Sequence, residues 1–274
     1  MRFRPVRAAL LAEAGLLVGF AVSARAPAPP DPMPAFETFT IAFRGLGERR
    51  TINVYTPPGY ATSGKAFPVL YMPDGGLAED FPHIVTTVDS LVRLKRIRPF
   101  VVVGIENTER RRDLTGPTTV GTDSAIAPRV GGSAAFRAFI RDELMPEVRT
   151  RYRCTDETAI VGESLAGLFV VETALLEPTL FRRYIALDPS VWWNRGELVR
   201  TAEGRMGALG DTARTLYMAT SKEPGTTVGI TRLAAILKAH APPGLTWYYE
   251  PRPDLTHGTI FRAVAPAAFV KVLE

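Results

Sequence analysis

The sequence predicts one α/β domain on a mostly parallel, doubly wound sheet of about eight strands, with helices on both faces. The first observation is that short apolar or β-branched runs alternate with segments of helical period over residues 35–274. The second is that the run at 100–105 is almost wholly apolar, as is typical of a central parallel strand. The third is that 46% of the 274 residues are hydrophobic, which is enough for one large core.

The segment before this domain is predicted to be a leader. Three arginines within the first seven residues precede an apolar stretch at 8–22, and small residues occupy 22–24. This pattern is typical of an export signal, so we expect a signal peptide over 1–24 and a stiff Pro-rich linker over 25–34. The stretch is shorter than the ~20 residues of a spanning helix, so no stable membrane span is expected after leader removal. The domain over 35–274 is therefore expected to be secreted or periplasmic.

The first part of the domain has the pattern of strands and one helix. Alternation at 36–43 predicts a half-buried strand, and a second strand at 50–55 ends at Pro-Pro-Gly. The apolar run 67–72 stops at Pro-Asp-Gly-Gly and predicts a buried third strand. Apolar residues recur at helical spacing over 81–92, and the run at 100–105 gives the central strand.

Residues 107–132 break this alternation, because they are rich in Arg, Thr, Gly and Asp and have no apolar periodicity. A loop of this length in a compact domain is usually functional or disordered. A helical pattern resumes at 133–148, and a short β-branched run at 160–161 leads into another helix. The remaining predicted elements are strands at 183–187, 215–219 and 245–249, and helices at 226–240 and 258–273.

The composition excludes several function classes. The formal net charge of +5 is modest and the basic residues form no long run, so nucleic acid is not an expected partner. A single cysteine, Cys154, excludes an internal disulfide framework and a cysteine-based metal cluster, and we expect it to be a partly buried thiol. We expect no metal and no organic cofactor. The oligomeric state is left open.

Ser164 is the candidate nucleophile. A β-branched run stops at Gly162 and a helix-forming run begins after Ser164, so the chain must turn sharply there. A serine on such an elbow presents its hydroxyl at the substrate side of the sheet. The backbone N–H of Leu165 then lies at a helix N-terminus, where it can stabilise an oxyanion. The Gly-x-Ser-x-Gly pattern departs at Ala166, with Gly167 one place late.

The serine needs a base, and the sequence offers three histidines. His83 falls in the first turns of a predicted helix, and His240 falls at the end of another. His257 lies in the loop after the last predicted strand. The chain order serine, acid, histidine leaves room for an acid only before His257, which is therefore the candidate base.

Three carboxylates are candidates for the acid that orients His257. Glu223 follows the strand at 215–219 and is preferred, because catalytic groups gather at the carboxyl edge of such a sheet. Asp188 follows the strand at 183–187, and Asp254 lies three residues before His257. A solvated turn carboxylate is the alternative role for each, so the choice stays open.

A second oxyanion donor is expected in the loop after the third strand. Asp74-Gly75-Gly76 is the obvious place, because glycines let backbone N–H groups approach a ligand closely. We predict the N–H groups of Gly76 and Leu165 as the oxyanion donors.

Four blocks, taken in order, resemble the putative esterase family of α/β hydrolases. They are "VLYMPDGG", "VVVGIENTERRRDLT", "AIVGESLAGLFVVETALLEPTLFRRYIALDPSVWWN" and the His-Gly pair at 257–258. The similarity runs from about Phe39 to the end of the chain. The family includes enterochelin-type siderophore esterases, related carbohydrate-ester hydrolases and mycolyltransferases, and the nearest subgroup resembles esterases of bacillibactin and enterobactin trilactones.

The resemblance implies an α/β-hydrolase fold and esterase activity. By position it implies Ser164 as nucleophile, His257 as base, Gly76 as oxyanion donor and, on the mycolyltransferase pattern, Glu223 as acid. The chain departs from the family at Ala166, where Gly is usual, and at Asp188, where Ser is common. The second departure reopens the question of which acid serves His257.

We therefore expect a serine esterase that hydrolyses small-molecule esters through an acyl-enzyme on Ser164. Arg110 and Arg112 in the long loop would suit a siderophore-like or other anionic ester, and Trp192 and Trp193 would line an acyl pocket. The alternatives for these four are a salt-bridged surface loop and ordinary packing. Alternative functions are an acyltransferase with the same triad and a non-catalytic binding protein on a hydrolase scaffold.

Overall fold

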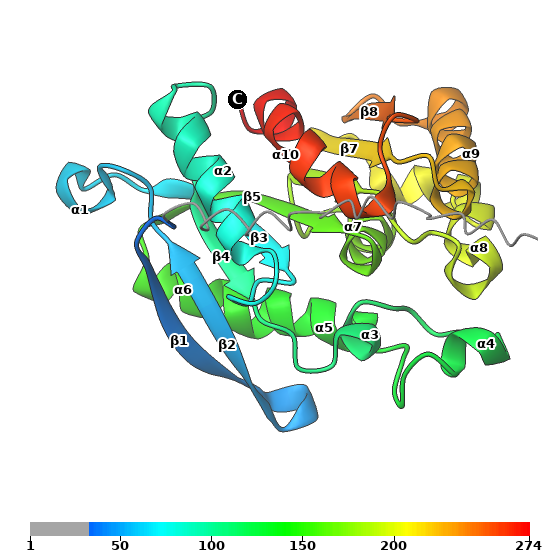
Figure 1. The fold of residues 1–274 in the computed structure, drawn as a ribbon, viewed down its shortest axis with the longest axis horizontal. Coiled ribbons are helices and arrows are strands. Elements are labelled where there is room, and N and C mark those ends of the chain that lie inside the picture. Colours follow the sequence, from blue (N-terminus) through cyan, green and yellow to red (C-terminus); the bar gives the residue numbers. More distant parts are fainter. Residues whose placement is uncertain (1–32) are drawn as a thin grey trace, which may run out of the picture. The chain divides into compact units, whose positions relative to one another are not determined.

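One eight-stranded sheet organises the computed structural model, which describes residues 33–274 (Figure 1). The strand order is β1-β2-β4-β3-β5-β6-β7-β8; β2 pairs antiparallel with β1 and β4, and the other pairs are parallel. The predicted mostly parallel sheet is confirmed. The strands are β1 (Phe36–Phe43), β2 (Glu48–Tyr55), β3 (Phe67–Pro73), β4 (Val101–Ile105), β5 (Cys154–Glu163), β6 (Arg183–Leu187), β7 (Arg214–Thr220) and β8 (Leu245–Pro251).

Helices follow most of the parallel strands, as the alternating pattern predicts. They are α1 (Tyr60–Ser63), α2 (Phe81–Arg93), α3 (Arg110–Asp113), α4 (Gly121–Ser124), α5 (Ser133–Phe139), α6 (Met145–Arg151), α7 (Leu165–Leu176), α8 (Trp193–Arg200), α9 (Pro224–His240) and α10 (His257–Leu273). Short helical turns lie at Arg44–Leu46 and Glu203–Leu209, and a π-helical turn at Ile140–Leu144 joins α5 to α6.

The sheet is covered on both faces, and its central strands β3 and β4 are buried at every position. Along β3, Val69 and Tyr71 pack into one core, and Leu70 and Met72 pack into the other. The first core is closed by α5, α6, α7 and α9, and the second by α2 and α10, which pack against each other (Figure 1). Helix α7 is apolar on all sides and buried, so it forms the central helix of its layer.

The long segment at 107–132 contains only the single helical turns α3 and α4. It is tied to the start of α8, where the Trp193 indole donates to the Gly116 carbonyl at 2.8 Å. The Asn194 N–H donates to the Asp123 carboxylate at 2.8 Å. Individual side-chain hydrogen bonds therefore hold the segment on the domain, and the sequence shows no periodic pattern that would predict them.

The predicted signal peptide and all but the last two residues of the predicted linker lie outside the described residues. No helix within 33–274 has the length and apolar character needed to cross a bilayer.

Candidate active site

The candidate nucleophile stands on the turn between β5 and α7. Ser164 has φ 60° and ψ −120°, a conformation that a non-glycine residue adopts only when its surroundings hold it. Its N–H donates to the Leu187 carbonyl at 3.1 Å, and its carbonyl accepts from the Ser190 N–H at 2.9 Å. Bonds from β6 and from the loop after it therefore fix the elbow that the sequence predicts.

Small residues allow α7 to leave close to β5. A Cβ atom on Gly162 would lie 2.6 Å from the backbone carbonyl of Ala166, and one on Gly167 would lie 3.0 Å from Pro189 Cα. The side chain of Ala166 is fully buried. Its methyl group fits in place of the usual glycine because Gly162, on the facing strand, has no side chain.

The candidate base comes from the last helix of the chain. His257 is the first residue of α10, so this helix begins one residue earlier than the sequence predicts, and Thr256 caps it. The His257 Nε2 atom lies 3.0 Å from Ser164 Oγ, within reach for proton transfer. The other two histidines lie elsewhere: His83 in α2, where burial lowers its pKa to about 4, and His240 at the end of α9.

The structure replaces Glu223, the acid preferred from the sequence, with Asp188. Asp188 Oδ2 lies 2.6 Å from His257 Nδ1, whereas Glu223 occupies the N-cap position of α9 and, among the described residues, forms no ion pair with His257. The reason is strand order: Asp188 follows β6, which adjoins β5, and Glu223 follows β7, one strand further away. Asp254 instead pairs with Arg252 at 2.8 Å on the surface.

The carboxylate of Asp188 is fully buried and accepts several hydrogen bonds. Ser221 donates its backbone N–H at 2.9 Å and its hydroxyl at 2.8 Å, and the Thr226 hydroxyl donates at 2.7 Å. Burial opposes ionisation, but the hydrogen bonds from His257, Ser221 and Thr226 outweigh it and lower the pKa of Asp188. The hydrogen bond to Asp188 in turn raises the pKa of His257. A charged partner at Nδ1 favours the tautomer in which Nε2 accepts the serine proton.

Two residues beside this chain of hydrogen bonds were not predicted from the sequence. Ser190 Oγ lies 3.5 Å from Ser164 Oγ, and Glu163 Oε1 lies 3.9 Å from His257 Nδ1. Glu163 immediately precedes the nucleophile, so its position in the motif was the available signal. No sequence motif indicates Ser190, because only the path of the loop after β6 brings its side chain near Ser164.

The two predicted oxyanion donors follow adjacent strands, β3 and β5. Leu165 is the first residue of α7, and the N–H groups of the first helical turn have no acceptor within the helix. The Gly76 N–H donates to Glu79 Oε2 at 2.7 Å. The side-chain amide of Asn107 donates to the other oxygen of Glu79 at 2.7 Å. One predicted donor is therefore occupied by a carboxylate.

The two predicted arginines have different positions. Arg112 is buried, and its guanidinium binds Glu48 at 2.5 Å and Asp113 at 2.7 Å, so its part in a substrate site is corrected to a structural ion pair. Arg110 is partly exposed and holds Asp74 through Nε at 2.7 Å and Nη2 at 2.8 Å. Of the two, Arg110 remains beside the loop that carries Gly76.

The two predicted tryptophans also differ in their surroundings. Trp193 is buried and anchors the segment 107–132, which corrects its prediction as a pocket wall. Trp192 has 42% of its surface exposed and borders a hollow of about 580 Å³ between α8 and α9. Trp192 lies two residues after Ser190 in the chain, but Ser164, Asp188 and His257 are not among the residues that line this hollow.

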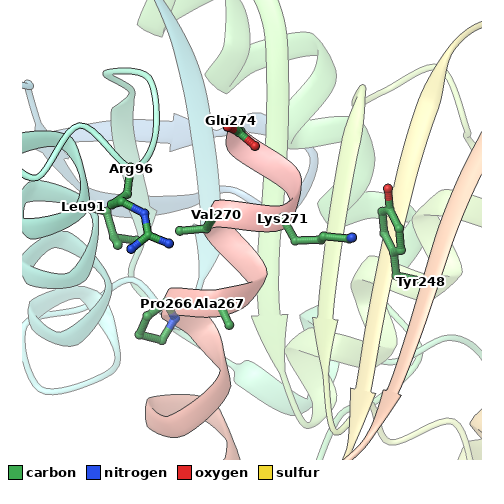
Figure 2. Close-up of a pocket in the computed structure, with 8 residues that line it drawn as sticks. All are labelled: Leu91, Arg96, Tyr248, Pro266, Ala267, Val270, Lys271 and Glu274. Atoms are coloured by element: carbon green, nitrogen blue, oxygen red, sulfur yellow. The ribbon is translucent and has the colours of Figure 1, made fainter.

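A second hollow, of about 530 Å³, lies near the C-terminal end of α10 (Figure 2). Figure 2 shows Lys271 extending from α10 toward Tyr248, with Arg96 beside Val270. The α10 residues that line it run from Pro266 to Lys271, so this hollow is about 14–21 Å along the helix from His257. It contains none of the predicted site residues.

Metal ligands and a second nucleophile do not emerge elsewhere in the described chain. Within residues 33–274, no group of three or more His, Cys, Asp or Glu side chains is arranged to hold a metal ion. Cys154 is half-buried at the start of β5, and burial raises the pKa of its thiol to about 11. A thiol with this pKa is a poor nucleophile at neutral pH.

The sheet, the elbow and the order of Ser164, Asp188 and His257 define the α/β-hydrolase type of fold. Solved structures agree: an IroE-like serine hydrolase from Shewanella oneidensis superposes with a TM-score of 0.78 at 27% identity, covering 86% of this chain and 79% of that one. The siderophore hydrolase EstB from Aspergillus nidulans has a TM-score of 0.73 at 22% identity, covering 88% and 95%, which supports the fold alone.

Within this class, the chain belongs to the esterase family described as "Putative esterase", whose model matches residues 44–220. The chain is 30% identical over 181 residues to a ferri-bacillibactin esterase of Bacillus subtilis, covering 57% of this chain and 59% of that protein. It is 29% identical over 161 residues to a siderophore enterobactin esterase of Emericella nidulans, covering 51% and 52%. The matched region thus spans little more than half the length of these two relatives.

Proposed function

We propose that this protein is a serine esterase that hydrolyses carboxylic esters through an acyl-enzyme on Ser164. The observation that carries the proposal is the continuous chain from Ser164 Oγ to His257 Nε2 at 3.0 Å and from His257 Nδ1 to Asp188 Oδ2 at 2.6 Å. His257 accepts the proton of Ser164 as the hydroxyl attacks the ester carbonyl, and Asp188 stabilises the imidazolium. His257 then protonates the leaving alcohol, and water releases the acyl group by the same route.

The tetrahedral intermediate needs donors for its negative oxygen, and the proposed pair is the N–H groups of Leu165 and Gly76. Leu165 supplies the first N–H of α7, where the helix dipole favours a negative charge. Gly76 is bound by Glu79, so the carboxylate must leave before the oxyanion can take that N–H.

The proposed substrate is a siderophore-like or other anionic ester. The names of the two relatives above, and the exposed edge of Arg110 next to Asp74, support this choice. We further propose that the protein acts outside the cytoplasm, since the first 24 residues have the pattern of an export signal.

Labelling by a fluorophosphonate tests the nucleophile directly. The expected result is one stoichiometric adduct on the peptide that carries Ser164, absent from Ser164→Ala and strongly reduced in His257→Ala. Turnover of a ferric catecholate trilactone, compared with a neutral p-nitrophenyl ester, then tests the substrate class. Folded protein that gives neither an adduct nor turnover would contradict the proposed function and favour a binding role.

A further inference from the structure

A second carboxylate faces the same nitrogen of His257 as Asp188 does. Glu163 is the last residue of β5, directly before Ser164, and its side chain is 17% exposed. Its Oε1 lies 3.9 Å from His257 Nδ1, and Asp188 Oδ2 lies 2.6 Å from that nitrogen. Glu163 ends β5 and Asp188 directly follows the adjacent, parallel strand β6, so they reach the imidazole from neighbouring positions of the sheet.

Glu163 differs from Asp188 in how its charge is supported. Asp188 accepts hydrogen bonds from Ser221 and Thr226, whereas within residues 33–274 no side-chain hydrogen bond to the Glu163 carboxylate is found. A mostly buried carboxylate without donors is costly to fold. Stability does not account for a glutamate here, and within residues 33–274 the one group of opposite charge within 4 Å of its carboxylate is the imidazole of His257 when that ring is protonated.

The charges around Glu163 come from four elements. Burial raises its pKa to about 7; Asp80 at the start of α2 and Asp188 after β6 act in the same direction, while His257 in α10 and Arg110 in α3 oppose it. Glu163 therefore ionises near neutral pH, and it lies 3.9 Å from an imidazole whose own pKa is raised, chiefly by Asp188.

We propose that Glu163 is a second carboxylate partner of His257, a positioning residue that stabilises the imidazolium formed when Ser164 attacks. The proposal rests on the proposed esterase function. In the attack, the proton leaves Ser164 Oγ for His257 Nε2 as the bond between Oγ and the ester carbon forms. The positive charge created on the ring is then shared between Asp188 in direct contact and Glu163 at longer range.

The pH dependence of turnover gives the sign of this effect. A carboxylate near the ring favours the protonated imidazole and so raises the pKa of His257. Glu163→Gln removes that charge while keeping the shape of the side chain. The base then becomes neutral at lower pH, and the acid limb of kcat/KM moves to lower pH. The plateau value falls as well, because the imidazolium in the transition state loses a partner.

The test compares Glu163→Gln with Glu223→Gln, using kcat/KM for a neutral p-nitrophenyl ester between pH 5 and pH 9. We expect Glu163→Gln to lower the plateau about tenfold and to move the acid limb by about half a pH unit or more. Glu223→Gln is the matched control, because Glu223 acts on the His257 pKa only through space, more weakly than Asp188 and Glu163 and with no ion pair to the ring among the described residues, and its kcat/KM should stay within about twofold of the wild type. Glu163→Asp, which keeps the charge, should restore the limb toward its wild-type position.

Thermal unfolding supplies an independent readout. The pKa of Glu163 is raised from 4.5 to about 7 in the folded protein. The folded protein therefore loses stability as pH rises from 4.5 to about 7, because the charged carboxylate is less favourable in the fold than in the unfolded chain. Glu163→Gln should therefore raise Tm at pH 8 by about 2–4 °C and change it little at pH 5. A loss of activity together with a gain of stability is the opposite of what a purely structural residue would show.

Titration of the His257 ring by NMR in a Ser164→Ala background separates this inference from the esterase proposal, since it needs no turnover. A lower His257 pKa after adding Glu163→Gln supports the contact even if no ester is hydrolysed. An unchanged His257 pKa overturns the inference even if the enzyme is an active esterase. Equal pH profiles for the Glu163 and Glu223 variants would also overturn it.

Discussion

At the scale of single residues, the site depends on backbone conformations that are rare outside glycine. Asp74, Ser164 and Asp188 follow β3, β5 and β6, and their φ angles are 55°, 60° and 45°. These strand ends lie side by side in the sheet. Strained conformations persist only where the surroundings determine them, and they cluster at functional sites. Their recurrence at three adjacent strand ends supports this edge as the reactive one.

The choice between Asp188 and Glu223 gives a prediction at this scale. Asp188→Asn should lower kcat by about 10³- to 10⁴-fold, because the amide can no longer hold His257 in the reactive tautomer or stabilise its charge. Glu223→Gln should leave kcat within about twofold, since it removes no contact to the ring. Steady-state kinetics on a neutral ester measures both. A larger loss in the Glu223 variant would return the acid to the position preferred from sequence.

At the scale of elements, loops after neighbouring strands decide which groups meet. The loop after β3 carries Gly76 and Glu79, and the loop after β4 carries Asn107, which holds the Glu79 carboxylate from the other side. Strands β3 and β4 are paired in parallel, so both loops emerge at the same edge. The Glu79 carboxylate is thus held by groups from two loops, and no sequence motif indicates this arrangement.

Glu79 supplies the prediction at the element scale. A carboxylate on an oxyanion donor competes with the intermediate for that N–H and repels its charge. If Gly76 is a donor, Glu79→Gln should raise kcat for a neutral ester by about two- to tenfold with little change in KM. Asp89→Asn, whose carboxylate lies on α2 in contact with Tyr55 and Arg93, is a control for charge removal from the same helix region. A fall in kcat for Glu79→Gln would show that Glu79 supports the loop and does not block it.

At the scale of the whole molecule, a buried ionic network joins the antiparallel edge of the sheet to the segment 107–132. Arg50 on β2 is fully buried, and its guanidinium lies over the rings of Phe43 and Phe136. Its guanidinium pairs with Asp113 of α3 at 2.5 Å, and Asp113 also binds Arg112. This network links parts of the chain that are more than sixty residues apart.

Asp113 therefore carries a prediction about global stability. Asp113→Ala should lower the free energy of unfolding by about 3–5 kcal/mol, because it leaves the Arg50 guanidinium buried with only a longer contact to Glu48. Asp142→Asn removes a solvent-exposed partner of Arg141 and should leave the unfolding midpoint nearly unchanged. Denaturant titration measures both. Similar midpoints for the two variants would mean that the buried network adds no net stability.

Much of the fold follows from local patterns in the sequence. The strands at 36–43 and 183–187 coincide with the observed β1 and β6, because their apolar spacing and flanking turn residues specify them locally. The sequence does not predict helix α8, since Trp192 and Trp193 occupy its N-cap and first position, and the next three residues, Asn194, Arg195 and Gly196, all have positive φ angles. Strand β5 begins at Cys154, earlier than its apolar run, because the neighbouring strand β3 pairs with its polar start.

The sequence by itself determined the alternation of strands and helices, the elbow at Ser164 and the assignment of His257 to that serine. These depend on local chemistry and on chain order, which a sequence contains. Only the tertiary structure decided that Asp188 contacts His257, that Glu163 faces the same nitrogen and that Arg112 is buried in an ion pair. The physical reason is that the interaction of a carboxylate with a neighbouring group depends on their distance and on their burial. Both depend on which strand ends lie next to each other in the sheet.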